Sequence, residues 1–193
     1  MDYSLVLNNI SKHIMLDADE TAYFTSLLKY KDVRKKEFLL KEGQTCRYIN
    51  YVHSGALRAY HLDVEGNESV IMFAINDWWV TDMYSFTTLQ PAMLNIDALE
   101  DSTIFELDKN DLDKLYIKVP KFERFFRIIM QNSYVREQLR VIQNLSISAE
   151  QKYLNFLAKY PQFVQRVSQK QIASYLGMTP EFLSVIRKKL SKS

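Results

Sequence analysis

The chain has 193 residues, of which 47% are hydrophobic, and its 25 basic and 23 acidic side chains leave a formal net charge of only +2. Its single cysteine, Cys46, excludes an intrachain disulfide and a metal or iron–sulfur site built from several cysteines. The N-terminus shows no signal peptide and no apolar run approaches the ~20 residues that span a bilayer, so we expect a cytoplasmic protein with no membrane partner.

The first 30 residues are predicted to be mainly helical, because Val6, Ile10 and Ile14 recur at helical spacing and a second stretch begins at Asp17. From about residue 37, short apolar runs alternate with turn residues. These runs predict strands at 38–40, 48–52, 56–61, 69–75, 94–99 and 103–107. Turn signals at roughly 8–12-residue spacing are typical of an antiparallel sandwich or barrel.

A short helix is predicted from Asp108 to near Pro120, followed by the longest helix, from about 121 to 144. Alternating steps of three and four residues, the spacing of a coiled-coil seam, link Phe125, Ile128, Asn132, Val135, Leu139 and Ile142. A second apolar set, expected to cover the β domain, comprises Phe122, Phe126, Ile129, Val141 and Leu145.

A helix with two apolar faces needs two partners, so the seam predicts a homodimer in which the polar Asn132 fixes the register of the paired helices. The alternative is that both faces are buried within one subunit. The pattern favours the homodimer.

Ser148 begins a further helix that stops at Tyr160-Pro161, and residues 167–190 then predict two short helices joined by Gly177. Ser168 and Gln171 have the spacing of a capping box at the start of the first helix. In the second helix, the predicted buried stripe comprises Phe182, Leu183, Ile186 and Leu190. This pattern is typical of a helix-turn-helix, whose second helix enters the DNA major groove. An ordinary αα-hairpin is the alternative.

The charges of the chain are distributed unevenly. Residues 161–193 hold six basic side chains and one acid, Glu181, for a net charge of +5, whereas residues 1–160 hold 19 bases and 22 acids. A basic C-terminal segment on an acidic body is the electrostatic footprint of a protein that meets DNA phosphates at one end. The alternative is a solvated basic tail.

The order of these motifs resembles that of the Crp/Fnr family of bacterial transcription regulators over essentially the whole chain, with its Bacteroidetes-type branch the most similar. The segments behind this resemblance are residues 52–58, 148–154, 160–161, 171–184 and 186–189. The resemblance implies an α+β chain: N-terminal helices and an antiparallel β jelly roll of the cyclic-nucleotide-binding type (residues 1–120), a dimerisation helix (121–146) and a helix-turn-helix DNA-binding domain (147–193). The chain ends three residues after Leu190, so we expect no complete C-terminal wing.

The resemblance also implies a function. Members of this family act as non-enzymatic, sequence-specific DNA-binding homodimers that bind a pseudo-palindromic operator in double-stranded DNA, with RNA polymerase as a further partner. The candidate DNA contacts in this chain are Gln169, Lys170, Thr179, Pro180, Glu181, Ser184, Val185, Arg187 and Lys188. Family members that read guanine have arginines at the positions of Pro180 and Val185, so we expect base contacts to concentrate on Glu181, Ser184 and Lys188.

The predicted sensor domain departs from its cyclic-AMP-binding relatives. Those members hold the phosphate with a Gly-Glu-Leu-Gly turn and an Arg-Ser pair, where this chain has residues 80–83 and, near the second motif, Ala92-Met93. No Arg or Lys occurs between Arg58 and Lys109, so a bound phosphate would lack a local cation. We therefore expect no cofactor and no cyclic AMP binding of the usual kind. The candidate pocket for an unknown small-molecule effector comprises Arg58, Trp78, Trp79, Asp82 and Tyr84, and core packing of these side chains is the alternative.

Two other functions compete with this interpretation. A metal-binding cupin-like enzyme would need two or three histidines on facing strands, and only His53 and His61 lie in the sheet region. A dimeric jelly-roll module for interaction or ligand sensing, which has lost DNA binding, is the stronger alternative.

Overall fold

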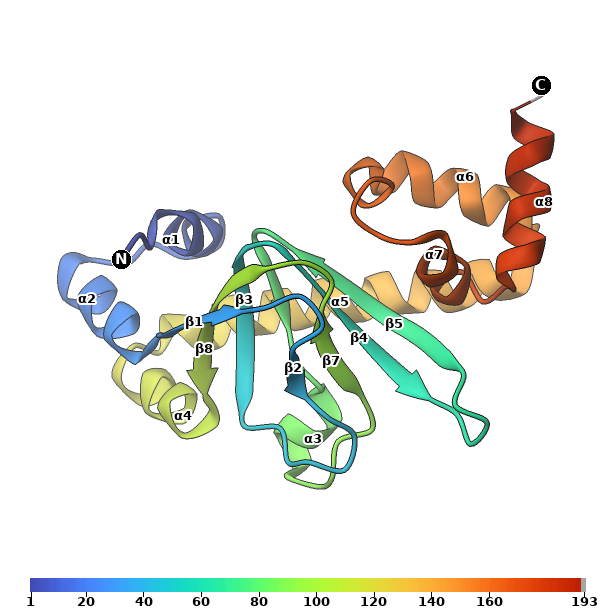
Figure 1. Ribbon diagram of the computed structural model, residues 1–193. Helices are drawn as coiled ribbons and strands as arrows, with labels where there is room; N and C mark the ends of the chain where they lie inside the picture. Colours follow the sequence, from blue (N-terminus) through green and yellow to red (C-terminus); the bar gives the residue numbers. More distant parts are fainter. Residues whose placement is uncertain (192–193) are drawn as a thin grey trace.

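The computed structural model describes residues 1–191, so Lys192 and Ser193 of the predicted DNA-binding domain lie outside the described residues. Helices α1 (Ser4–Ser11) and α2 (Ala18–Leu27) come first (Figure 1). α2 begins with a capping box in which the Asp17 side chain accepts from the Glu20 N–H and the Glu20 side chain accepts from the Asp17 N–H.

The β domain follows these helices. Its strands are β1 (Lys29–Val33), β2 (Phe38–Leu40), β3 (Tyr48–Ser54), β4 (Ala56–Leu62), β5 (Glu68–Ile75), β6 (Trp78–Val80), β7 (Asn95–Ala98) and β8 (Ser102–Asp108). In the described part of the chain they form two four-stranded antiparallel sheets, ordered β1-β8-β3-β6 and β2-β7-β4-β5. The predicted antiparallel jelly roll is thereby confirmed.

Three elements of this domain differ from the sequence prediction. β1 lies at the end of the stretch predicted as helix, and β6 and helix α3 (Met83–Thr88) were not predicted. β1 is an edge strand whose side chains are mostly exposed, so it lacks a buried apolar run. β6 has only three residues and exists because it pairs with Asn50–Val52 of β3, a contact between distant parts of the chain.

The two faces of β4 have different neighbours. Leu57 and Ala59 point into the core between the sheets, whereas Ala56 and Tyr60 belong to a second buried cluster shared with the C-terminal helices. Gly55 precedes the strand with a φ of +96°, and a Cβ there would overlap Ser102. The outer face of the second sheet is therefore a platform for the C-terminal part of the chain.

Helices α4 (Lys109–Lys118) and α5 (Lys121–Ser146) follow, and α5 continues past the sheets to the C-terminal helices (Figure 1). Phe122, Phe125 and Phe126 are buried in the core at its first turns. Phe125 packs against the rings of His13 and Trp79 at 5.9 and 6.1 Å, so the structure removes it from the predicted seam.

The later part of α5 also corrects a prediction. Val141 and Leu145 do not cover the β domain, because the helix has left the sheets at that point and both side chains are exposed. Ile129 remains packed against the core, as expected.

The C-terminal unit comprises α6 (Ala149–Lys159), the short 3-10 helix η1 (Pro161–Phe163), α7 (Gln169–Tyr175) and α8 (Pro180–Leu190). The capping box of Ser168 and Gln171 is confirmed, and Gly177 has a φ of +68° in the turn between α7 and α8. Thr179 caps α8 through its side chain. The predicted stripe of α8 is wrong at Phe182, which is 51% exposed because the small helical unit covers only Leu183 and Ile186 fully.

Candidate nucleic-acid interface and sensor cleft

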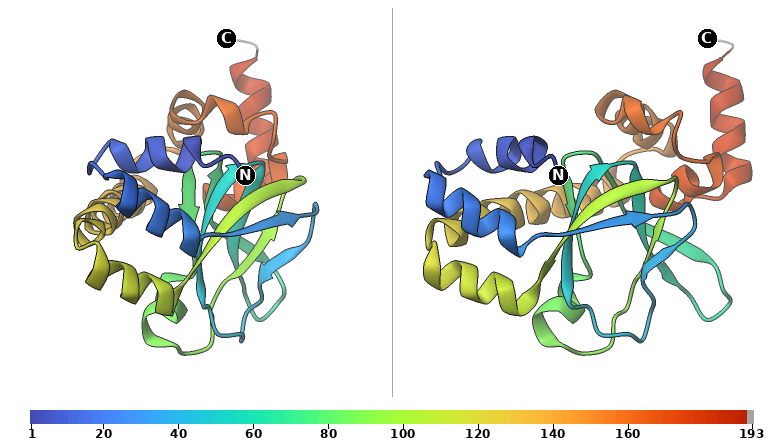
Figure 2. Two further views of the ribbon diagram at one scale, coloured as in Figure 1. Left: turned by 90° about the vertical axis from the view of Figure 1, so that its left-hand side faces the viewer. Right: turned by 60° about the vertical axis from the view of Figure 1, so that its left-hand side comes forward.

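Helix α8 presents an open face to solvent. It lies at the outer end of the C-terminal unit and extends beyond the sheets in both views of Figure 2. Glu181, Ser184, Val185 and Lys188 are exposed on it, opposite the buried Leu183 and Ile186. Pro180 occupies the first turn, where its missing N–H leaves no bond unmade. The side chains predicted to contact bases therefore share one solvent-facing surface.

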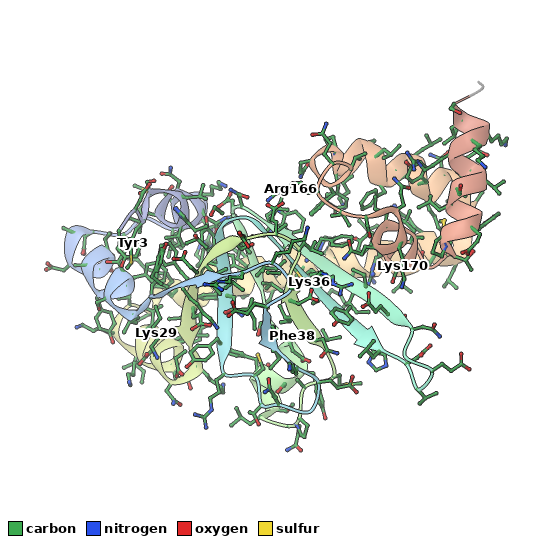
Figure 3. The ribbon with its side chains drawn as sticks, in the orientation of Figure 1. Tyr3, Lys29, Lys36, Phe38, Arg166 and Lys170 are labelled. Atoms are coloured by element: carbon green, nitrogen blue, oxygen red, sulfur yellow. The ribbon has the colours of Figure 1, made fainter. Side chains whose placement is uncertain are left out.

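The remaining predicted DNA contacts surround this face. Lys170 projects from the first turn of α7 and is exposed (Figure 3), while Arg187 and Thr179 are exposed on and before α8. Gln169 is half-buried, and its Oε1 atom is buried without a hydrogen-bond partner among the described residues. These groups lie where a helix-turn-helix meets the sugar–phosphate backbone.

Polar contacts fix the C-terminal unit to the second sheet. The Ser174 hydroxyl on α7 donates to the carbonyl of Glu68 and accepts from the N–H of Val70 at 2.9 Å. Arg166, labelled in Figure 3, forms an ion pair with Glu100. α7 thus docks on β5, and this placement leaves α8 free to face outward.

Aromatic contacts reinforce this junction. The Tyr175 ring packs on Phe73 at 5.3 Å, and the Arg140 guanidinium of α5 lies 5.1 Å from the same ring. Burial raises the pKa of the Tyr175 phenol. α5, β5 and α7 therefore all contribute to the contacts around Tyr175.

Arg58 does not line a pocket with the predicted tryptophans. Its guanidinium donates to both carboxylate oxygens of Asp97, at 2.8 and 3.0 Å, and to Glu68 at 2.5 Å. Burial by itself would lower the pKa of Arg58, but the hydrogen bonds to Asp97 and Glu68 outweigh that effect and raise it. The cation is already paired with two carboxylates of its own chain.

Asp82 is a structural side chain, only 1% exposed. Its carboxylate caps α3 by accepting from the Ser85 N–H and also accepts from the N–H groups of Met93 and Leu94, each at 3.0 Å. The resemblance to the Crp/Fnr family implies that these segments stand where cyclic-AMP-binding members carry their phosphate-binding motifs. The Asp82 carboxylate therefore already occupies these backbone N–H donors. Tyr84, another predicted sensor residue, lies exposed on α3.

Trp78 and Trp79 line a cleft of about 620 Å³ between β6 and α5. Its apolar walls also include Met72 and Met130. The Trp79 indole N–H donates to Asn9 at 3.1 Å, and the Arg136 guanidinium lies 5.4 Å from the Trp78 ring. Met130 and Arg136 were not among the predicted sensor residues, because only the tertiary fold brings α5 to β6.

The predicted seam of α5 is open beyond its first turns. Val135, Leu139 and Ile142 are each about half exposed, Asn132 is exposed and Ile128 is half-buried. Tyr134, Val141 and Leu145 add further exposed apolar surface to the same stretch. Asn132 also lines the cleft, so the seam and the cleft adjoin each other.

A search of the described residues finds no group of three or more His, Cys, Asp and Glu side chains placed to hold a metal ion. Among the helices of that same part of the chain, none has the length and apolar character required to cross a membrane.

Comparisons with known proteins add independent findings. Residues 30–118 match the cyclic nucleotide-binding domain family. The chain is 27% identical over 180 residues to the regulatory protein HlyX of Actinobacillus pleuropneumoniae, covering 84% of this chain and 72% of HlyX. It is 25% identical over 178 residues to the fumarate and nitrate reduction regulatory protein of Vibrio cholerae, covering 84% and 69%. Its fold is similar to that of FixK2 from Bradyrhizobium japonicum, with a TM-score of 0.75, 18% identity and coverage of 86% and 85%.

Proposed function

We propose that this chain, whose matched domain, relatives and fold are those of Crp/Fnr regulators, is a homodimeric, sequence-specific DNA-binding transcription regulator. The observation that supports this most directly is the open face of α8, which lies in the basic C-terminal segment. In this proposal residues 1–120 form the sensor domain, 121–146 the dimerisation helix and 147–193 the DNA-binding domain.

α8 enters the major groove in this proposal. Glu181 accepts from a cytosine N4 amino group, while Ser184 and Lys188 contact further base edges. Lys170, Gln169 and Arg187 contact the sugar–phosphate backbone and set the register of the helix. A two-fold dimer then binds half-sites about one helical turn, or ~34 Å, apart, which requires a pseudo-palindromic operator.

Dimerisation uses the open part of α5. Val135, Leu139 and Ile142 of one protomer pack against the same residues of the second, and burial of this apolar surface drives the association. Asn132 sets the register at a cost in stability. The seam residue Phe125 takes no part, because the core of its own chain already buries it.

The sensor domain does not take cyclic AMP in the usual way. Arg58, the cation that precedes residues 80–93 in the sequence, is held by Asp97 and Glu68. The carboxylate of Asp82 occupies the backbone donors that a phosphate would need. An effector of this protein instead uses the cleft between β6 and α5, whose Trp78 and Trp79 favour an apolar or planar molecule.

An electrophoretic shift assay tests the DNA proposal. The purified protein should retard promoter fragments, including one from its own gene, and affinity should fall steeply between about 50 and about 200 mM salt. Lys188→Ala should weaken binding, whereas Lys35→Ala, an exposed lysine of the β domain, should not. If no promoter fragment is retarded at low salt, the chain is better described as an interaction or sensing module without DNA binding.

A further inference from the structure

The DNA-facing surface of α8 contains an apolar side chain that its packing does not explain. Val185 is 62% exposed, although the same helix buries Leu183 and Ile186. It follows Glu181 by four residues and precedes Lys188 by three, so these three side chains share one face of the helix. A valine is therefore exposed among the polar groups predicted to contact bases.

The chemistry of valine restricts what it can recognise. It has no hydrogen-bond donor or acceptor, so it cannot contact the polar edge of guanine, cytosine or adenine productively. Thymine alone presents an apolar group in the major groove, the C5-methyl. Valine is also held largely to one χ1 rotamer in a helix, so its two methyl groups are positioned before binding.

We propose that Val185 contacts the C5-methyl group of a thymine in each half-site of the operator and thereby selects thymine at that base pair. This inference rests on the proposed DNA-binding function. Glu181 and Lys188 then place hydrogen bonds on the neighbouring base pairs, while the valine excludes water from the methyl group.

The experiment begins with selection from a randomised duplex library by the wild-type protein at fixed salt. In the enriched duplex, each thymine is then replaced in turn, symmetrically in both half-sites, by deoxyuridine, which differs from thymine only by the lost methyl group. Affinities are compared by fluorescence anisotropy for the wild type, Val185→Ala and Val64→Ala. Val64 is a fully exposed valine in the hairpin between β4 and β5 and serves as the matched control.

At one position in each half-site, deoxyuridine should weaken wild-type binding by roughly tenfold. Val64→Ala should keep this loss, whereas Val185→Ala, which lacks both γ-methyl groups, should reduce it sharply. Val185→Arg should move the preference at that base pair to guanine, since arginine pairs with its O6 and N7 atoms.

Two results would overturn the inference. One is that no thymine responds to methyl removal, and the other is that Val185→Ala responds as the wild type does. Both leave the proposed function in place, because the library was enriched. A library that shows no enrichment contradicts the DNA-binding function itself and the inference with it.

Discussion

Leu139 lies in the exposed apolar seam of α5, and Leu139→Ala should weaken the homodimer. The side chain is 49% exposed in the single chain, so pairing would remove about half of its surface from water. Complete burial of a leucine is worth ~1.5–3 kcal/mol relative to exposure. Burial of the exposed half is worth half of that free energy in each protomer, so the two leucines together contribute ~1.5–3 kcal/mol to the dimer. Their loss should raise the dissociation constant roughly 10- to 150-fold.

Sedimentation velocity over a range of protein concentrations measures this constant. Ile117→Ala is the matched control, because Ile117 is an 83% exposed apolar residue on α4, outside the seam. The control should dimerise like the wild type, and Leu139→Ala should dissociate at a higher concentration. Thermal unfolding of each variant at low concentration checks that the protomer itself remains folded.

If both variants have the dissociation constant of the wild type, the seam is not the interface. A wild type that remains monomeric at every accessible concentration would equally contradict the predicted interface. Either result would require another explanation for the exposed apolar surface at Val135, Leu139 and Ile142.

Three further predictions concern the β domain. Arg58→Met leaves the buried Asp97 without its cation and should cost ~3–5 kcal/mol of unfolding free energy in urea titrations; an unchanged midpoint would contradict the buried ion pair. Asp82→Ala leaves the backbone N–H groups of Ser85, Met93 and Leu94 without their acceptor and should cost at least ~2 kcal/mol. Calorimetry of the wild type with cyclic AMP should show no binding heat. Burial and the hydrogen bond to Asp77 raise the pKa of Tyr51, so only its unfolded form ionises near pH 10. The contribution of Tyr51 to stability should therefore be constant below pH 10 and fall above it by up to ~1.4 kcal/mol per pH unit, so the fall of total stability at alkaline pH should be shallower in Tyr51→Phe.

Local sequence signals predicted the elements whose ends are set by local chemistry. Ser168 and Gln171 at α7, Thr179 and Pro180 at α8, and Ser148 at α6 occupy the capping positions that their residue types favour. The interior strands were equally recognisable, because β3 and β4 are buried apolar runs that end in turns.

Elements that depend on distant contacts were not predictable in this way. β6 forms only through pairing with β3, and the first turns of α5 reach the core only because the sheets lie beside them. Helical periodicity placed Phe125 in the seam and Phe182 in a buried stripe. Periodicity gives the face of a side chain but not the extent of the neighbour that covers it, and here that extent reversed both assignments.

In the candidate site, too, features of a single helix were predictable from the sequence and contacts between distant strands were not. The sequence placed Glu181, Ser184 and Lys188 correctly on the open face of α8, since that face is a property of one helix. It did not place Arg58 beside Asp97 and Glu68, which come from other strands. Because Arg58 is paired with Asp97 and Glu68, contacts in the folded chain leave its guanidinium unavailable to an effector.

Two copies of this chain are expected to hold one operator through α8. Light scattering coupled to size-exclusion chromatography measures the mass of the complex with the selected duplex. We predict two chains per duplex, and loss of the complex when Glu181→Ala and Lys188→Ala are combined, with Lys35→Ala unaffected. A complex of one chain per duplex, or one that survives the α8 substitutions unchanged, would contradict the account.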